Sequence, residues 1–173
     1  MPGESDSWDL GIGAGFYLDA TKAPWNKAYQ MESFIVHELR PLVAKEFPSI
    51  DESRTGIFGH SMGGHGALTL ALKYPDIFRS CSAFAPIAHP SHCEWGKKAF
   101  TAYLQKEEEW KLHDACELLA NYVGKGLNIL IHVGTGDKFY NEGQLLPEDL
   151  VEAANDVNEV KVDLKKVSNY DHR

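Results

Sequence analysis

Apolar positions along this chain follow two patterns, short apolar runs and longer stretches with helical spacing. The runs at residues 57–58, 81–85 and 128–133 are short and bounded by turn residues, which is typical of buried strands. Residues 160–167 alternate between apolar and polar side chains, which predicts a half-buried strand. The chain therefore offers four candidate strands, separated by segments of a different periodicity.

The segments between these strands have the spacing of helices. Pro41 falls inside the first of them, where its missing N–H and its ring predict a kink or break. Asp114 and Pro147 stand where a helix cap and a first helical residue are favoured. The helices are expected over residues 29–47, 62–74, 97–104, 114–122 and 147–157. Their alternation with the strands predicts an α/β fold, with a mostly parallel sheet flanked by helices.

The turn between the strand at 57–58 and the helix at 62–74 reads Gly59-His60-Ser61-Met62-Gly63. A Gly-x-Ser-x-Gly turn between a strand and a helix is typical of a nucleophile elbow, in which the serine occupies a strained position. The alternative is a glycine-rich turn with an incidental serine, and the flanking strand and helix favour the nucleophile. The backbone N–H of Met62 is then expected to form part of an oxyanion hole.

In an α/β-hydrolase the acid and the histidine follow the serine, each just after a later strand. Asp137 follows the strand at 128–133, and His172 follows the strand at 160–167, so we interpret them as the orienting acid and the general base. The alternatives are a solvated loop aspartate and a disordered terminal histidine. Asp171 is a weaker candidate for the acid, because adjacent residues in an extended loop point apart.

The other histidines fit the base position less well. His60 and His65 lie beside the serine and follow no later strand, and His132 lies inside a strand, as a core residue would. His89, His92 and Cys93 are close enough in sequence to suggest a metal site, but no second ligand pair accompanies them. The sequence thus predicts no metal.

Composition narrows the class of protein. The 173 residues predict one domain over 1–173, and 43% hydrophobic with 24% charged residues indicates a globular chain. A net charge of −8 without a basic block argues against nucleic-acid binding, and no apolar run is long enough to cross a bilayer. Three cysteines without a CxxC pair, behind an N-terminus that lacks a signal-peptide core, fit reduced thiols in a cytoplasmic protein.

Several stretches carry a family resemblance, among them Phe58-Gly-His-Ser-Met-Gly-Gly-His-Gly-Ala67 and Tyr170-Asp-His172. The others are residues 7–21, 82–87, 95–100 and 143–147. The chain resembles the S-formylglutathione hydrolase (esterase D) family, with its α/β-hydrolase fold. The resemblance implies a cytosolic serine thioesterase that converts S-formylglutathione to glutathione and formate in formaldehyde detoxification, with side activity on small esters. It places the family's triad on Ser61, Asp137 and His172 and implies no cofactor and a possible homodimer.

The chain departs from the family pattern at both ends. The family has several strands and helices before the segment at Trp8 and a helix after the histidine, so we expect a truncated form that lacks the first strands and the second oxyanion donor. The strand at 55–58 is expected to become a sheet edge with exposed apolar faces, and His172 is expected to fray, with weakened activity. The alternatives are a general short-chain carboxylesterase and a non-catalytic interaction form. Cys93 is interpreted as a structural cysteine rather than a redox-sensitive one.

Overall fold

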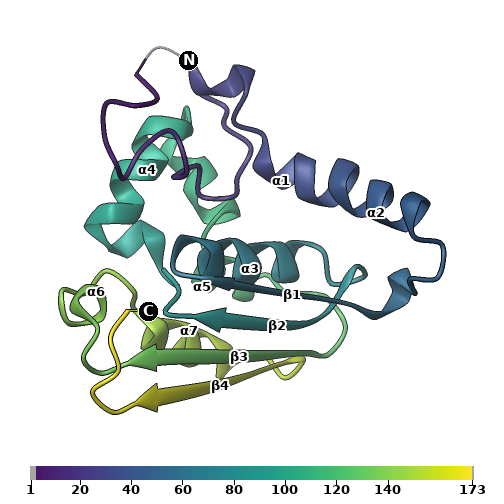
Figure 1. Cartoon of the computed structure of the whole chain (residues 1–173). Helices are drawn as coiled ribbons and strands as arrows, with labels where there is room; N and C mark the ends of the chain where they lie inside the picture. Colours follow the sequence, from purple (N-terminus) through teal and green to yellow (C-terminus); the bar gives the residue numbers. More distant parts are fainter. Residues whose placement is uncertain (1–2, 173) are drawn as a thin grey trace.

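The computed structural model describes residues 3–172 and contains a four-stranded, fully parallel sheet (Figure 1). Its strands are β1 (Thr55–His60), β2 (Phe78–Phe84), β3 (Leu127–Gly134) and β4 (Val160–Val167), paired in the order β1-β2-β3-β4. Each strand is longer than the apolar run that predicted it, or equal to it. The predicted α/β fold with a parallel sheet is confirmed.

The sheet is covered by helices on one face. Helix α3 (Met62–Lys73) packs on β1 and β2, α7 (Pro147–Ala154) packs on β4, and α5 (Ala115–Leu119) contacts both helices. The remaining helical segments are α1 (Met31–Ser33), α2 (Arg40–Glu46), α4 (Glu94–Tyr103) and α6 (Lys138–Asn141), with the short turns η1 (Trp25–Lys27), η3 (Glu52–Arg54), η4 (Pro90–His92) and η5 (Glu107–Leu112). None of the helices over residues 3–172 is long and apolar enough to span a membrane.

Strand β1 lies at the edge of the sheet, as the sequence predicted. Along it, half-buried residues alternate with exposed ones, and the Phe58 side chain is 79% exposed. Phe84 of β2 is also exposed. Parallel sheets usually have both faces covered. Within residues 3–172, this sheet therefore presents a partly apolar face at its β1 edge.

Of the kink or break predicted at Pro41, no break is present, because helical backbone continues from Met31 to Glu46. The irregularity is a π-helical turn, η2 (Phe34–Leu39), placed just before the proline, and the Arg40 N–H donates to the Ile35 carbonyl. A proline lacks an N–H and its ring clashes with the carbonyl four residues earlier. A wider turn before Pro41 relieves that conflict without interrupting the helix.

Other helix boundaries differ from the prediction for local reasons. Helix α4 begins at Glu94 rather than at 97, because the Cys93 sulfur accepts a hydrogen bond from the Gly96 N–H at 3.3 Å and caps the helix. Asp114 caps α5 as predicted, by accepting from the Cys116 N–H at 3.0 Å. Segments α6 and η5 were missed, since neither is long enough to show a periodicity.

Two groups of buried side chains form the interior. One lies between the sheet and α3, α5 and α7 and includes Leu68 and Ile131. The other joins the N-terminal loop to α4 and includes Phe16 and Phe100. The Tyr103 hydroxyl holds this loop, because it accepts from the Gly11 N–H and donates to the Ala14 carbonyl, each at 2.8 Å. Figure 1 shows the N-terminal segment, in purple, lying against α4.

Candidate active site

Ser61 stands at the turn between β1 and α3 with φ 55° and ψ −119°, a backbone conformation that is strained for a residue with a side chain. Its N–H donates to the Phe84 carbonyl at 2.8 Å, and its carbonyl accepts from the His65 N–H at 3.0 Å. A Cβ at Gly59 would lie 2.0 Å from the Gly63 carbonyl oxygen, so only glycine fits there. The turn has the geometry of a nucleophile elbow.

A further glycine of this segment, Gly66, lies on the side of α3 that faces the N-terminal loop. A Cβ at this position would lie 2.6 Å from the Cβ of Tyr17. The residue therefore makes room for the N-terminal loop. This contact between α3 and residue 17 is set by tertiary packing, which the local pattern did not indicate.

The structure brings together the three residues that the sequence singled out. The Nε2 of His172 lies 2.9 Å from the Ser61 Oγ, and its Nδ1 lies 2.6 Å from the Asp137 Oδ2. Asp137 is fully buried in the turn after β3, and His172 follows β4. With the Nδ1 hydrogen directed at the carboxylate, the Nε2 is free to accept the serine hydroxyl hydrogen.

The two oxygens of Asp137 have separate partners. While Oδ2 contacts the imidazole, Oδ1 accepts from the Phe139 N–H at 2.8 Å and from the Tyr140 N–H at 3.3 Å. These two bonds cap the N-terminus of α6. The missed helix α6 therefore fixes the orientation of the carboxylate. The sequence signal was available in hindsight, because aspartate is a favoured N-cap.

His172, which the sequence led us to expect to fray, has contacts on several sides. The His60 Nε2 lies 2.5 Å from the His172 carbonyl oxygen, and the His60 and Phe139 rings each lie 4.7 Å from the His172 ring, centroid to centroid. Just before it, the Tyr170 carbonyl accepts from the Gly136 N–H at 2.9 Å. His60, considered in the sequence only as a possible base, thus contacts His172 itself.

The remaining histidines lie in other surroundings. His65 is buried between the Phe16 and Phe100 rings, and burial lowers its pKa to about 4, outweighing the opposite effect of Asp114. His132 is half-buried and its ring meets the Phe84 ring edge-on. Asp171, the weaker candidate for the acid, is not the residue that contacts the His172 Nδ1, since Asp137 occupies that position.

Two open cavities adjoin the site. One, of about 570 Å³, is lined by the glycine-rich loop at residues 11–15, by Tyr29 and by Met62. The other, of about 520 Å³, lies beside Gly59, His60 and His172. The glycine-rich loop therefore shares a cavity with Met62, the residue that follows Ser61. Met62 is the first residue of α3, where backbone N–H groups lack acceptors within the helix.

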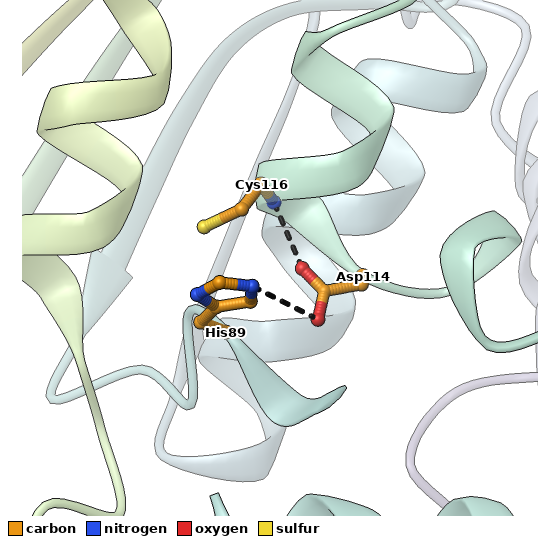
Figure 2. A group of neighbouring side chains, drawn as sticks. All are labelled: His89, Asp114 and Cys116. Atoms are coloured by element: carbon orange, nitrogen blue, oxygen red, sulfur yellow. Dashed lines mark hydrogen bonds and ion pairs between the residues drawn. The ribbon is translucent and has the colours of Figure 1, made fainter. Parts of the chain in front are cut away.

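His89, His92 and Cys93, which the sequence suggested as a metal site, do not all point toward one another. The His89 and His92 rings are 3.7 Å apart, but the Cys93 sulfur caps α4 and donates to the Pro90 carbonyl at 3.7 Å. His89 instead lies beside Asp114 and Cys116, both nearly or fully buried (Figure 2). All three cysteines are free and buried.

Known proteins share both the sequence and the fold. The chain is 49% identical to mouse S-formylglutathione hydrolase and 46% identical to the Arabidopsis thaliana enzyme, over 99% of its own length in each case. It covers 61% and 60% of those relatives, so it spans about three fifths of their length. The solved S-formylglutathione hydrolase of Agrobacterium tumefaciens is 44% identical and superposes with a TM-score of 0.89, over 96% of this chain and 59% of that one.

A more distant structure shares the fold alone. The Mycobacterium tuberculosis protein MPT51 is 16% identical and has a TM-score of 0.70. The family profile described as "Putative esterase" matches residues 2–173, nearly the whole chain. This chain therefore belongs to the putative esterase family.

Proposed function

We propose that this protein is a serine hydrolase in which Ser61 is the nucleophile, His172 the general base and Asp137 the orienting carboxylate. The observation that carries the proposal is the continuous chain of hydrogen bonds from the Ser61 Oγ through His172 to Asp137, with contacts of 2.9 and 2.6 Å. The strained backbone at Ser61 supports it, because such conformations persist where the surrounding structure enforces them and are common at active sites.

The geometry fits two-step acyl transfer. The Ser61 Oγ attacks the substrate carbonyl carbon while its proton passes to the His172 Nε2, and the Asp137 carboxylate stabilises the imidazolium. The backbone N–H of Met62 donates to the oxyanion of the tetrahedral intermediate. When the C–S or C–O bond breaks, the imidazolium returns the proton to the leaving group. Water, activated by the same histidine, then releases the acid and restores the Ser61 hydroxyl.

For the substrate, we propose S-formylglutathione, with glutathione and formate as products and small carboxylic esters as side substrates. The support is the identity of 44–49% with proteins named S-formylglutathione hydrolase, together with a site that requires no cofactor for hydrolysis. The two cavities beside the triad residues offer room for an acyl group and a larger thiol. Free, buried cysteines fit the cytoplasmic location that a glutathione-dependent reaction implies.

The test compares S-formylglutathione with 4-nitrophenyl acetate on the purified protein and on Ser61→Ala. We expect the thioester to be the better substrate by kcat/KM and both activities to fall at least about 10⁴-fold in the variant. If the acetate is preferred by a large factor, the general carboxylesterase replaces the thioesterase. Labelling with a fluorophosphonate is expected to be stoichiometric and to require Ser61; a folded protein that does not react would be the non-catalytic form.

We also propose that the protein forms a homodimer through the β1 edge. The supporting observations are the single neighbouring strand of β1 and the exposed Phe58 side chain within the described residues. Sedimentation velocity is expected to show a dimer that Phe58→Lys shifts toward the monomer. A monomer at all concentrations tested would remove this proposal and leave the hydrolase proposal untouched.

A further inference from the structure

Away from Ser61, three side chains with metal-binding atoms converge between η4 and α5 (Figure 2). They are His89, just before η4, Asp114, the N-cap of α5, and Cys116 in its first turn. Their donor atoms all lie within 4.8 Å of one another. Asp114 is fully buried and Cys116 is 8% exposed, so these groups face one another rather than solvent.

The hydrogen bonds around His89 leave one of its nitrogens unexplained. Its Nδ1 lies 2.7 Å from the Asp149 Oδ2, which places the ring hydrogen on that side. The Nε2 is buried and has no hydrogen-bond partner, and the Asp114 Oδ2 lies 4.0 Å from it. In the neutral imidazole a lone pair then faces a carboxylate oxygen across a buried gap, an unfavourable arrangement unless a cation lies between them.

The carboxylate of Asp114 is itself fixed in place. Its Oδ2 accepts from the Ser91 N–H at 2.9 Å and from the Ser91 hydroxyl at 2.7 Å, and its Oδ1 accepts from the Cys116 N–H at 3.0 Å. The carboxylate of Asp149 accepts the hydrogen bond of the His89 Nδ1. Metal-bound histidines commonly donate their other ring N–H to a carboxylate in this way. Both oxygen and nitrogen ligands therefore have the supporting contacts that a metal site needs.

We infer that His89, Asp114 and Cys116 form a binding site for a zinc ion. Nitrogen, carboxylate oxygen and sulfur together are a donor set that suits Zn²⁺ and disfavours Mg²⁺ and Ca²⁺, which take oxygen ligands. Around tetrahedral zinc, such ligand atoms lie roughly 3.3–3.8 Å apart, so each pair has to close by at most about 1.5 Å. On binding, the Cys116 S–H bond is replaced by a Zn–S bond and the proton leaves to water.

The fourth position faces an open groove. This groove, of about 460 Å³, is lined by His89, His92, Cys116 and Asp149, among others. A water molecule from the groove completes the coordination of an ion held by three protein ligands. Because the ligands come from the segment after β2 and from α5, the ion links these two segments. The inference does not depend on the proposed hydrolase activity, since none of these residues contacts Ser61, Asp137 or His172 through any hydrogen bond of the described residues.

The experiment titrates the chelator-treated protein with Zn²⁺ by equilibrium dialysis and with Co²⁺ by absorbance. We expect one ion per chain and a near-ultraviolet thiolate-to-cobalt band. Cys116→Ser is expected to lose the band and at least about tenfold in affinity, and Asp149→Asn to lose about 10–100-fold. The matched control is Cys93→Ser, which removes the thiol beside His92. This variant is expected to keep the thiolate-to-cobalt band and the wild-type affinity.

Circular dichroism checks the fold of each variant, and the wild-type titration stands by itself if Cys116→Ser fails to fold. A folded wild-type protein that binds no stoichiometric zinc overturns the inference. Cobalt binding without the thiolate band also overturns it. So does a band that disappears in Cys93→Ser and persists in Cys116→Ser, because the site would then be the pair formed with His92.

Discussion

Two aspartate–histidine pairs in this protein have nearly the same geometry and different surroundings. In each, the histidine Nδ1 contacts a carboxylate oxygen, at 2.6 Å between His172 and Asp137 and at 2.7 Å between His89 and Asp149. They differ at Nε2, which meets the Ser61 hydroxyl at 2.9 Å in one pair and has no hydrogen-bond partner in the other. The aspartate fixes the ring orientation in both, and the two proposed roles, general base for His172 and metal ligand for His89, rest on what faces the Nε2.

The largest expected effect tests the orienting role at the first pair. Asp137→Asn keeps an oxygen for the cap of α6 but can direct an amide N–H at the imidazole, which reverses the tautomer and leaves the Nε2 protonated. We expect kcat to fall about 10⁴-fold. The control is Asp156→Asn, an exposed aspartate after α7, with kcat near that of wild type. A loss below tenfold in the folded Asp137→Asn variant would contradict the role given to Asp137.

His65 extends the comparison to a histidine whose pKa is dominated by burial. Its pKa is about 4 in the folded state and about 6.5 in the unfolded state, so the unfolded chain binds more protons between these values. Above about pH 6.5, His65 therefore does not reduce the free energy of unfolding. As the pH drops toward 4, protonation of His65 in the unfolded chain lowers the free energy of unfolding by about 3 kcal/mol.

Urea unfolding between pH 4 and 8 measures this dependence. His113, whose pKa burial also lowers to about 4, adds a similar slope. We expect His65→Gln to remove about half of the dependence and to leave the part due to His113. Equal slopes in the two proteins would mean that His65 is accessible to protons in the native state.

A smaller effect concerns how the base of the first pair is held. His60→Ala removes the contact with the His172 carbonyl and one of the rings beside the imidazole. We expect kcat to fall about 10–100-fold with little change in KM, because the base loses alignment while the substrate cavities remain. His60→Gln, which retains a donor, is expected to recover part of the loss, and the exposed His37→Ala serves as the control. A change confined to KM would assign His60 to substrate binding.

The smallest effect concerns the carboxylates. The Oδ1 of Asp137 accepts from backbone N–H groups, whereas the Oδ2 of Asp114 also accepts from the Ser91 hydroxyl, which a substitution can remove. Ser91→Ala is expected to lower the free energy of unfolding by about 1–2 kcal/mol, since it removes a hydrogen bond to a buried charged group. Thermal unfolding of the chelator-treated variant measures it. An unchanged midpoint would show that water replaces the hydroxyl.

The elements and residues that the sequence predicted correctly depend on local signals. Periodicity, turn chemistry and strand order indicate the strands, the N-cap at Asp114, the first helical residue Pro147 and the places of Ser61, Asp137 and His172 just after strands. The π-helical turn before Pro41 was missed because the clash of the proline ring with the preceding turn can be relieved in two ways, by a break in the helix or by a wider turn. The contacts of His60 with His172 and of His89 with Asp114 were missed because they join segments 112 and 25 residues apart along the chain. No local pattern encodes such pairs.

The edge position of β1 has a consequence for the timing of inactivation. Within residues 3–172, the strand that leads to Ser61 exchanges hydrogen bonds with one neighbouring strand, β2, and the Ser61 N–H donates to the carbonyl of Phe84 at the end of β2. Edge segments open more often than central ones and at lower free-energy cost. The amides of β1 should then exchange with deuterium before those of β3, and the nucleophile should leave its strained conformation during openings that the rest of the sheet survives. In such a protein, activity is lost on warming before the fold is.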